Sequence, residues 1–93
     1  MLIRSQNKKE LIEMTSITIN VRTRQSSNKC YIEARQYSNI IFLGEYSTEE
    51  KALKVLDMLQ EEYLSPIVRN VVGENEVEIY QNKVFNMPED NEV

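Results

Sequence analysis

The sequence has no histidine and no tryptophan, and its 93 residues include one cysteine, two glycines and two prolines. The absence of histidine removes the commonest general base, the usual catalytic triads and most zinc sites. A single cysteine, Cys30, excludes an intramolecular disulfide and a cluster of thiolate metal ligands. Gly44 and Gly73 are too far apart to form a glycine-rich phosphate loop. We therefore expect a protein that is not an enzyme and that uses neither metal nor cofactor.

The remaining groups capable of chemistry are the carboxylates and Cys30. The acidic side chains fall on one face of a predicted helix, in residues 74–78 and near the C-terminus, where such groups are usually solvated. Cys30 falls on the inward side of a predicted strand, where a free cysteine usually behaves as a small hydrophobic residue. Since no histidine is present to activate it, we expect a buried thiol rather than a nucleophile.

The composition is that of one small globular domain, with 41% hydrophobic and 28% charged residues. We expect residues 1–88 to form this domain and residues 89–93 to be a frayed acidic tail. No apolar run approaches the roughly 20 residues that span a bilayer, and the first residues lack the apolar stretch of a secretory signal. The sequence thus predicts a cytoplasmic protein without membrane contact. A homodimer is compatible with it, since an interface would add buried surface to a small core.

The charge is unevenly distributed along the chain. Residues 1–46 carry seven basic and four acidic side chains, whereas residues 47–93 carry four basic and eleven acidic ones, which together give the net charge of −4. This asymmetry predicts two chemically different surfaces.

Strand patterns dominate the N-terminal half. Two short apolar segments around a polar turn at Asn7 predict a hairpin over residues 2–14. Residues 17–24 alternate between apolar and polar side chains, and residues 30–37 alternate again, which predicts two further strands. Residues 40–45 are almost continuously apolar, which favours a central or doubly covered strand.

A helix is predicted directly after these strands. Ser47 is a good N-cap, and Glu50 completes a capping box with it. Pro66 should end the helix near Ser65, because proline lacks the backbone donor that a helix needs. The core side of this helix consists of apolar residues at helical spacing: Ala52, Val55, Leu56, Leu59 and Tyr63.

The pattern after Pro66 is less regular. Residues 77–80 and 84–87 are compatible with a second hairpin across residues 81–83, and a short helix within residues 67–80 is the alternative. Strands followed by a helix and further strand predict an α+β fold. We expect an antiparallel β-meander sheet covered on one face by a single amphipathic helix, with room for a closing C-terminal strand or hairpin.

The inward residues of the predicted meander leave basic and aromatic side chains on the opposite sheet face: Arg22, Arg24, Tyr31, Arg35 and Tyr37. Arginine and tyrosine bind phosphates, stack on bases and anchor protein interfaces, so we expect these residues to form a binding face. The alternative interpretation is structural, because half-exposed strands prefer these residue types. Cross-strand pairs such as Arg22 with Glu33 would then add a little stability.

The chain resembles a group of small, largely uncharacterised proteins of Gram-positive bacteria and of their prophages, phages and conjugative elements. The resemblance is carried by residues 1–9, residues 43–49, Ala52, Val55, Leu56 and residues 84–89. It implies a mobile-element or phage context, and it implies no catalytic residues.

The sequence and this resemblance together predict a small non-enzymatic binding protein of phage or mobile-element origin. It would act in the cytoplasm of a bacterium, or of the phage's host, on a macromolecule that is most simply a protein. The alternative is a nucleotide- or nucleic-acid-binding module that uses the same basic and aromatic side chains.

Overall fold

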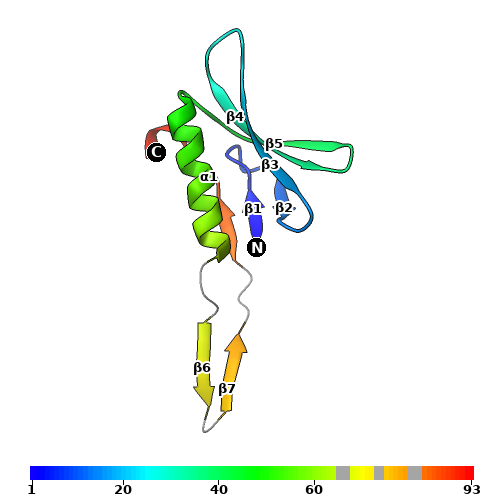
Figure 1. Ribbon diagram of the computed structural model, residues 1–93, viewed down its shortest axis with the longest axis vertical. Coiled ribbons are helices and arrows are strands. Elements are labelled where there is room, and N and C mark those ends of the chain that lie inside the picture. The colour runs from blue at the N-terminus through cyan, green and yellow to red at the C-terminus, as the bar shows by residue number, and fades with distance from the viewer. Residues whose placement is uncertain (65–67, 73–74, 80–82) are drawn as a thin grey trace.

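The computed structural model describes residues 1–64, 68–72, 75–79 and 83–93. The fold is α+β, as the sequence predicts: a meander sheet carries one long helix on one face, and a second small sheet lies beside it (Figure 1). A separate hairpin extends away from this body in Figure 1. It is formed by β6 (Val68–Val72) and β7 (Asn75–Ile79).

The meander sheet confirms the three strands predicted after the first hairpin. It consists of β3 (Thr18–Thr23), β4 (Cys30–Gln36) and β5 (Asn39–Tyr46), which lie in that order with antiparallel neighbours. The prediction of a central position for residues 40–45 is wrong, because β4 is central and β5 is an edge strand. The apolar run misleads since Ile40 and Phe42 project from the uncovered face and remain exposed.

The second sheet contains β2 (Leu11–Glu13), β1 (Leu2–Arg4) and β8 (Val84–Asn86), in that order. The β1–β2 hairpin is confirmed, but Lys8 rather than Asn7 takes the positive φ of its turn, 68°. Asn7 contributes through its side-chain oxygen, which accepts from the Ser5 hydroxyl at 2.7 Å and from the Lys9 N–H at 2.9 Å.

The C-terminal strand pairs differently from the prediction. β8 runs parallel to β1, with Ile3 opposite Phe85, so residues 84–87 do not form a hairpin with residues 77–80. Residues 68–72 and 75–79 are strands, which also makes the short-helix alternative wrong. The predicted helix end at Ser65 and Pro66 lies outside the described residues.

Helix α1 (Glu49–Leu64) begins one residue later than predicted. The Thr48 hydroxyl accepts the Lys51 N–H at 3.2 Å, so Thr48 is the N-cap, and the predicted capping box of Ser47 and Glu50 is wrong. The Ser47 N–H instead donates to Asp90 Oδ1 at 2.8 Å. Asp90, from the C-terminal end of the chain, thus supplies the acceptor for the Ser47 N–H that the predicted capping box assigned to Glu50.

One core joins the helix to both sheets. Its fully buried side chains come from all three parts: Ile3, Cys30, Ile32, Ala34, Leu43, Tyr46, Ala52, Val55, Leu59 and Met87. The burial of Cys30 confirms the sequence prediction. Tyr63 is 57% exposed, so its predicted core position is wrong. It lies at the rim of a groove between α1 and β3 rather than beneath the sheet.

The last residues pack against the domain, which differs from the frayed tail that we expected. A turn of 3-10 helix, η1 (Asp90–Glu92), follows Pro88, whose carbonyl accepts the Tyr46 hydroxyl at 2.8 Å and Gln6 Nε2 at 3.1 Å. Lys51 Nζ donates to the Asp90 carbonyl at 3.0 Å. These bonds connect the C-terminus to the turn between β1 and β2, to β5 and to α1.

Candidate binding face

The uncovered side of the meander sheet, opposite α1, is called the outer face here. Its register places Arg22 beside Tyr31, Glu33 beside Phe42, and Arg35 beside Ile40. Because side chains alternate between the two sides of a strand, these residues project together away from the core. The outer face is defined by Thr18, Asn20, Arg22, Tyr31, Glu33, Arg35, Ile40, Phe42 and Glu45.

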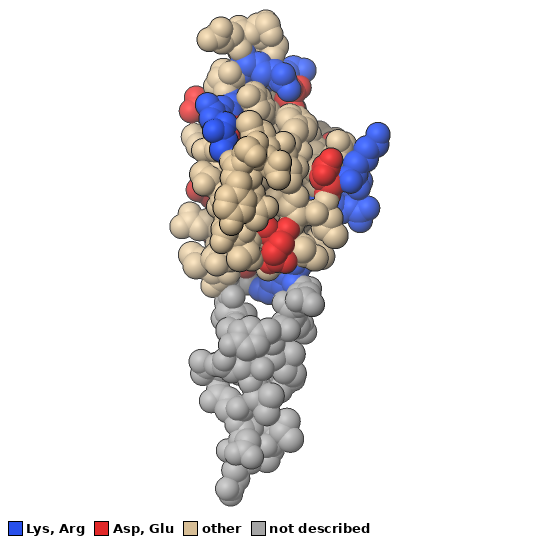
Figure 2. Space-filling model, turned by 90° about the vertical axis from the view of Figure 1, so that its right-hand side faces the viewer, with Lys and Arg blue, Asp and Glu red and all other residues tan. Residues whose placement is uncertain are grey.

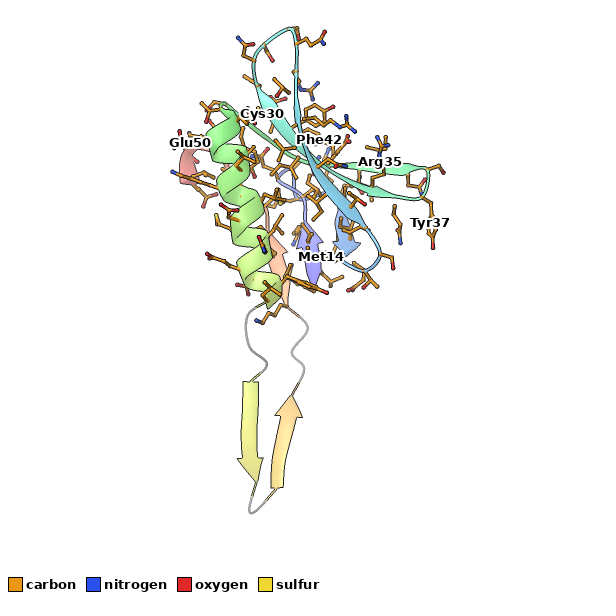
Figure 3. All side chains as sticks on the ribbon, viewed as in Figure 1. Met14, Cys30, Arg35, Tyr37, Phe42 and Glu50 are labelled. Carbon is orange, nitrogen blue, oxygen red and sulfur yellow. The ribbon has the colours of Figure 1, made fainter. Side chains whose placement is uncertain are left out.

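The structure brings four of the five predicted binding residues together. Arg22, Tyr31 and Arg35 lie on adjacent strands, and the Arg24 guanidinium carbon lies 4.8 Å from the centre of the Tyr31 ring. Tyr37 is separated from them. It lies in the tight turn between β4 and β5 with a φ of 53°, and it projects from the tip of that hairpin (Figure 3).

Two apolar residues of the outer face were not predicted as part of the site. The Phe42 ring stacks on Tyr31 with a centroid distance of 6.0 Å and an interplanar angle of 29°. Phe42 remains 38% exposed and Ile40 57% exposed. Extending the two-residue alternation from β4 into β5 could have identified them, but the continuous apolar run suggested burial. In Figure 3, Phe42 and Arg35 both lie on the meander sheet.

Two glutamates organise the charges of this face. Glu33 is only 5% exposed, and its Oε1 lies 3.0 Å from Arg22 Nε and 3.7 Å from Arg35 Nη2. The Arg22–Glu33 contact confirms the cross-strand pair considered in the structural interpretation, but the burial of Glu33 was not predicted.

Glu45, at the end of β5, also forms ion pairs with two basic side chains. Its carboxylate lies 2.7 Å from Arg24 Nε and 3.8 Å from Lys29 Nζ. Each carboxylate of the outer face is therefore shared by two basic side chains, which leaves the face with an excess of positive charge. Figure 2 shows one side of the molecule, on which Lys and Arg side chains lie toward the margins and Asp and Glu side chains are interspersed over a mostly uncharged surface.

The groups with perturbed pKa values lie elsewhere, where the C-terminus packs on the domain. Burial raises the pKa of the Tyr46 hydroxyl above its usual range, and Glu89 and Asp90 raise it further, so the hydroxyl stays a neutral donor to Pro88. The hydrogen bond from the Ser47 N–H lowers the pKa of Asp90. Among residues 1–64, 68–72, 75–79 and 83–93, no three His, Cys, Asp or Glu side chains gather as metal ligands.

The outer face thus presents aromatic surface, apolar surface and guanidinium donors, which are groups suited to binding another molecule. Comparisons with known proteins do not indicate which molecule this face would bind, because no family model, no curated protein and no solved structure matches the chain. In the part of the chain that the structure describes, no helix has the length and apolar character needed to cross a bilayer.

Proposed function

We propose that this chain is a small non-enzymatic binding protein that engages a host or phage macromolecule, most simply a protein, through the outer face. The observation that carries the proposal is the exposure of Ile40 and Phe42 beside Tyr31 and two arginines. Aromatic residues and arginine are enriched at protein interfaces and dominate their binding energy. The resemblance to small proteins of phages and conjugative elements supports a mobile-element context.

The charges of the outer face favour an acidic protein partner. Arg22 and Arg35 share Glu33, and Arg24 and Lys29 share Glu45, so acidic groups of a partner can approach under-neutralised guanidinium groups. The exposed side of α1 is acidic and would repel the same partner, which directs it to the sheet.

A nucleic acid or nucleotide is the second candidate. The stack of Tyr31 on Phe42 with Arg24 above it is the kind of platform on which bases pack. The net charge of −4 weighs against it, because neutralisation of many phosphates supplies most nucleic-acid affinity and the excess of positive charge here is confined to the outer face.

The proposal is tested by capturing partners from a Gram-positive bacterial lysate on the immobilised protein. Phe42→Glu places a charge in the outer face, and Leu53→Glu is the matched control, because Leu53 is a similarly exposed apolar residue on α1. We expect the wild type and the control to enrich the same protein at least about tenfold over Phe42→Glu. Equal capture by all three, or no enrichment by the wild type, would overturn the proposal.

The nucleic-acid alternative is measured in parallel by fluorescence anisotropy with single-stranded DNA and RNA oligonucleotides. Salt-sensitive binding that Arg24→Ala abolishes would favour the alternative over a protein partner, since phosphate contacts weaken as salt rises. We expect no such binding.

A further inference from the structure

The two edges of the meander sheet differ in how their backbone groups are satisfied. At the β5 edge, the Gln6 N–H donates to the Leu43 carbonyl at 2.7 Å, and the Glu45 N–H donates to Gln6 Oε1 at 2.9 Å. A bulge interrupts the same strand, because the partner of Ile32 is Gly44 whereas the partner of Glu33 is Phe42. At the other edge, no described residue forms a backbone hydrogen bond to the edge of β3 that points away from β4.

The β3 edge also lacks the features that usually prevent strand addition. Edges are commonly protected by short strands, bulges, prolines or charged side chains. β3 has six residues without proline or lysine, and its register with β4 is uninterrupted from Thr18 to Thr23. Its charged residue, Arg22, turns toward Glu33 of β4, with Nε 3.0 Å from the carboxylate, instead of covering the edge.

An apolar groove of about 240 Å³ lies at this edge, between β3 and the C-terminal half of α1. Ile17 and Ile19 line one side, and Leu56, Leu59 and Tyr63 line the other. No residue of β4 or β5 lines it, which places the groove at the β3 margin of the sheet. It is smaller than a site for a drug-sized ligand but suits a few apolar side chains.

Met14, the residue after β2, also lines the groove. An open strand edge beside an apolar groove and a helix is the arrangement in which extended peptides are bound by strand addition: the backbone bonds supply affinity, and every second side chain enters a pocket.

We propose that an extended segment of the partner protein adds to β3 as a further strand, with apolar side chains at alternate positions in the groove and acidic side chains at the positions between. The inference rests on the proposed function and specifies which element of the partner is recognised. The side chains that point away from the groove would lie beside Thr18, Asn20 and Arg22 on the outer face. Arg22 shares Glu33 with Arg35, so an added carboxylate pairs favourably with it.

A second copy of this chain is a less suitable occupant of the same edge. Its β3 would bring Thr18, Asn20 and Arg22 to the outer face and no carboxylate, so it would not complement the positive charge. Charge complementarity therefore favours a foreign acidic segment.

The test begins with selection of linear peptides from a random phage-displayed library on the immobilised full chain. We expect enriched sequences in which apolar residues alternate with Asp or Glu at a spacing of two. Enrichment of peptides with helical spacing, of basic alternating peptides, or of none would overturn the proposal.

The best selected peptide is then synthesised with backbone N-methyl groups on alternate residues. Because an added strand directs every second N–H toward β3, methylation of one alternate set should weaken binding at least about tenfold, and methylation of the other should change it less than about twofold. Equal effects of the two sets would contradict strand addition.

A pair of tyrosine variants locates the peptide. Tyr63→Ala removes a wall of the groove and should weaken peptide binding about fivefold or more, whereas Tyr37→Ala, at an exposed tyrosine that does not line the groove, should leave it unchanged. Sedimentation equilibrium should show a monomer; a dimer that the peptide dissociates would assign the edge to a second copy. If peptides fail while Phe42→Glu still abolishes partner capture, strand addition is wrong and the proposed function stands.

Discussion

Glu33 gives the sharpest test of how the outer face is held together. Its carboxylate is almost fully buried between Arg22 and Arg35, whereas Glu45 on the same face makes similar ion pairs with its side chain 32% exposed. Glu33→Gln keeps the size of the side chain and one acceptor oxygen but removes the charge. Comparing it with Glu45→Gln separates the effect of burial from the effect of losing a negative charge on this face.

The expected cost follows from the geometry. Hydrogen bonds to charged groups contribute about 1.5–3 kcal/mol, and breaking a fully buried ion pair costs about 3–5 kcal/mol. The side chains of Arg22 and Arg35 are 49% and 45% exposed, so both regain water when the charge is removed. We therefore expect Glu33→Gln to lower the free energy of unfolding by about 1–2 kcal/mol, and Glu45→Gln by at most about 0.5 kcal/mol.

Urea denaturation followed by far-UV circular dichroism at neutral pH measures both variants, since the chain has no tryptophan to report unfolding. In 1 M NaCl the effect of Glu45→Gln should disappear and that of Glu33→Gln should persist, because salt screens exposed pairs more than buried ones. The reasoning fails if Glu33→Gln is no more destabilising than Glu45→Gln.

Three further predictions concern local structure. In urea denaturation, Thr48→Ala should cost about 1 kcal/mol because it removes the helix N-cap, and Ser47→Ala less than about 0.5 kcal/mol; the reverse order would restore Ser47 as the cap. Tyr37→Gly should stabilise by about 1 kcal/mol in thermal unfolding, since its φ is 53°; destabilisation would contradict strain there. The pKa of Asp90 is lower in the folded protein than in the unfolded chain, so its carboxylate stabilises the fold fully above the unfolded pKa and loses this effect as the pH falls through the folded pKa. Asp90→Asn should therefore reduce the drop in melting temperature that the wild type shows below about pH 4. An unchanged drop would contradict this.

Local patterns predicted the parts of this fold that depend on neighbouring residues. The alternation over residues 17–24 and 30–37 gave the correct faces of β3 and β4, and with them the proximity of Arg22, Tyr31 and Arg35. The pairing of β8 with β1 joins strands at opposite ends of the chain, so no local pattern indicates it. The hydrogen bond from the Ser47 N–H to Asp90 was missed for the same reason, because it also joins residues that are far apart in the chain.

The burial of Glu33 could not be predicted from its position in the alternation. A glutamate on the solvent side of a strand is normally hydrated. Here Arg22 and Arg35 contact the carboxylate and Phe42 lies opposite Glu33 on β5, an arrangement that requires the register of three strands at once. The residues of the face were therefore predictable from the sequence, whereas the sharing of its charges was not.

The errors in predicting burial all concern residues at the two proposed contact surfaces. Ile40, Phe42 and Tyr63 follow patterns that assign them to the core, yet all three are exposed. Ile40 and Phe42 belong to the outer face and Tyr63 to the groove, and these surfaces adjoin along β3, which contributes side chains to both. Apolar residues that are exposed in the free protein, although their sequence pattern predicts burial, become buried when a partner packs on them. A strand added to β3 would fill the groove beside Tyr63 and extend the outer face, and the protein attached to it could then cover Ile40 and Phe42.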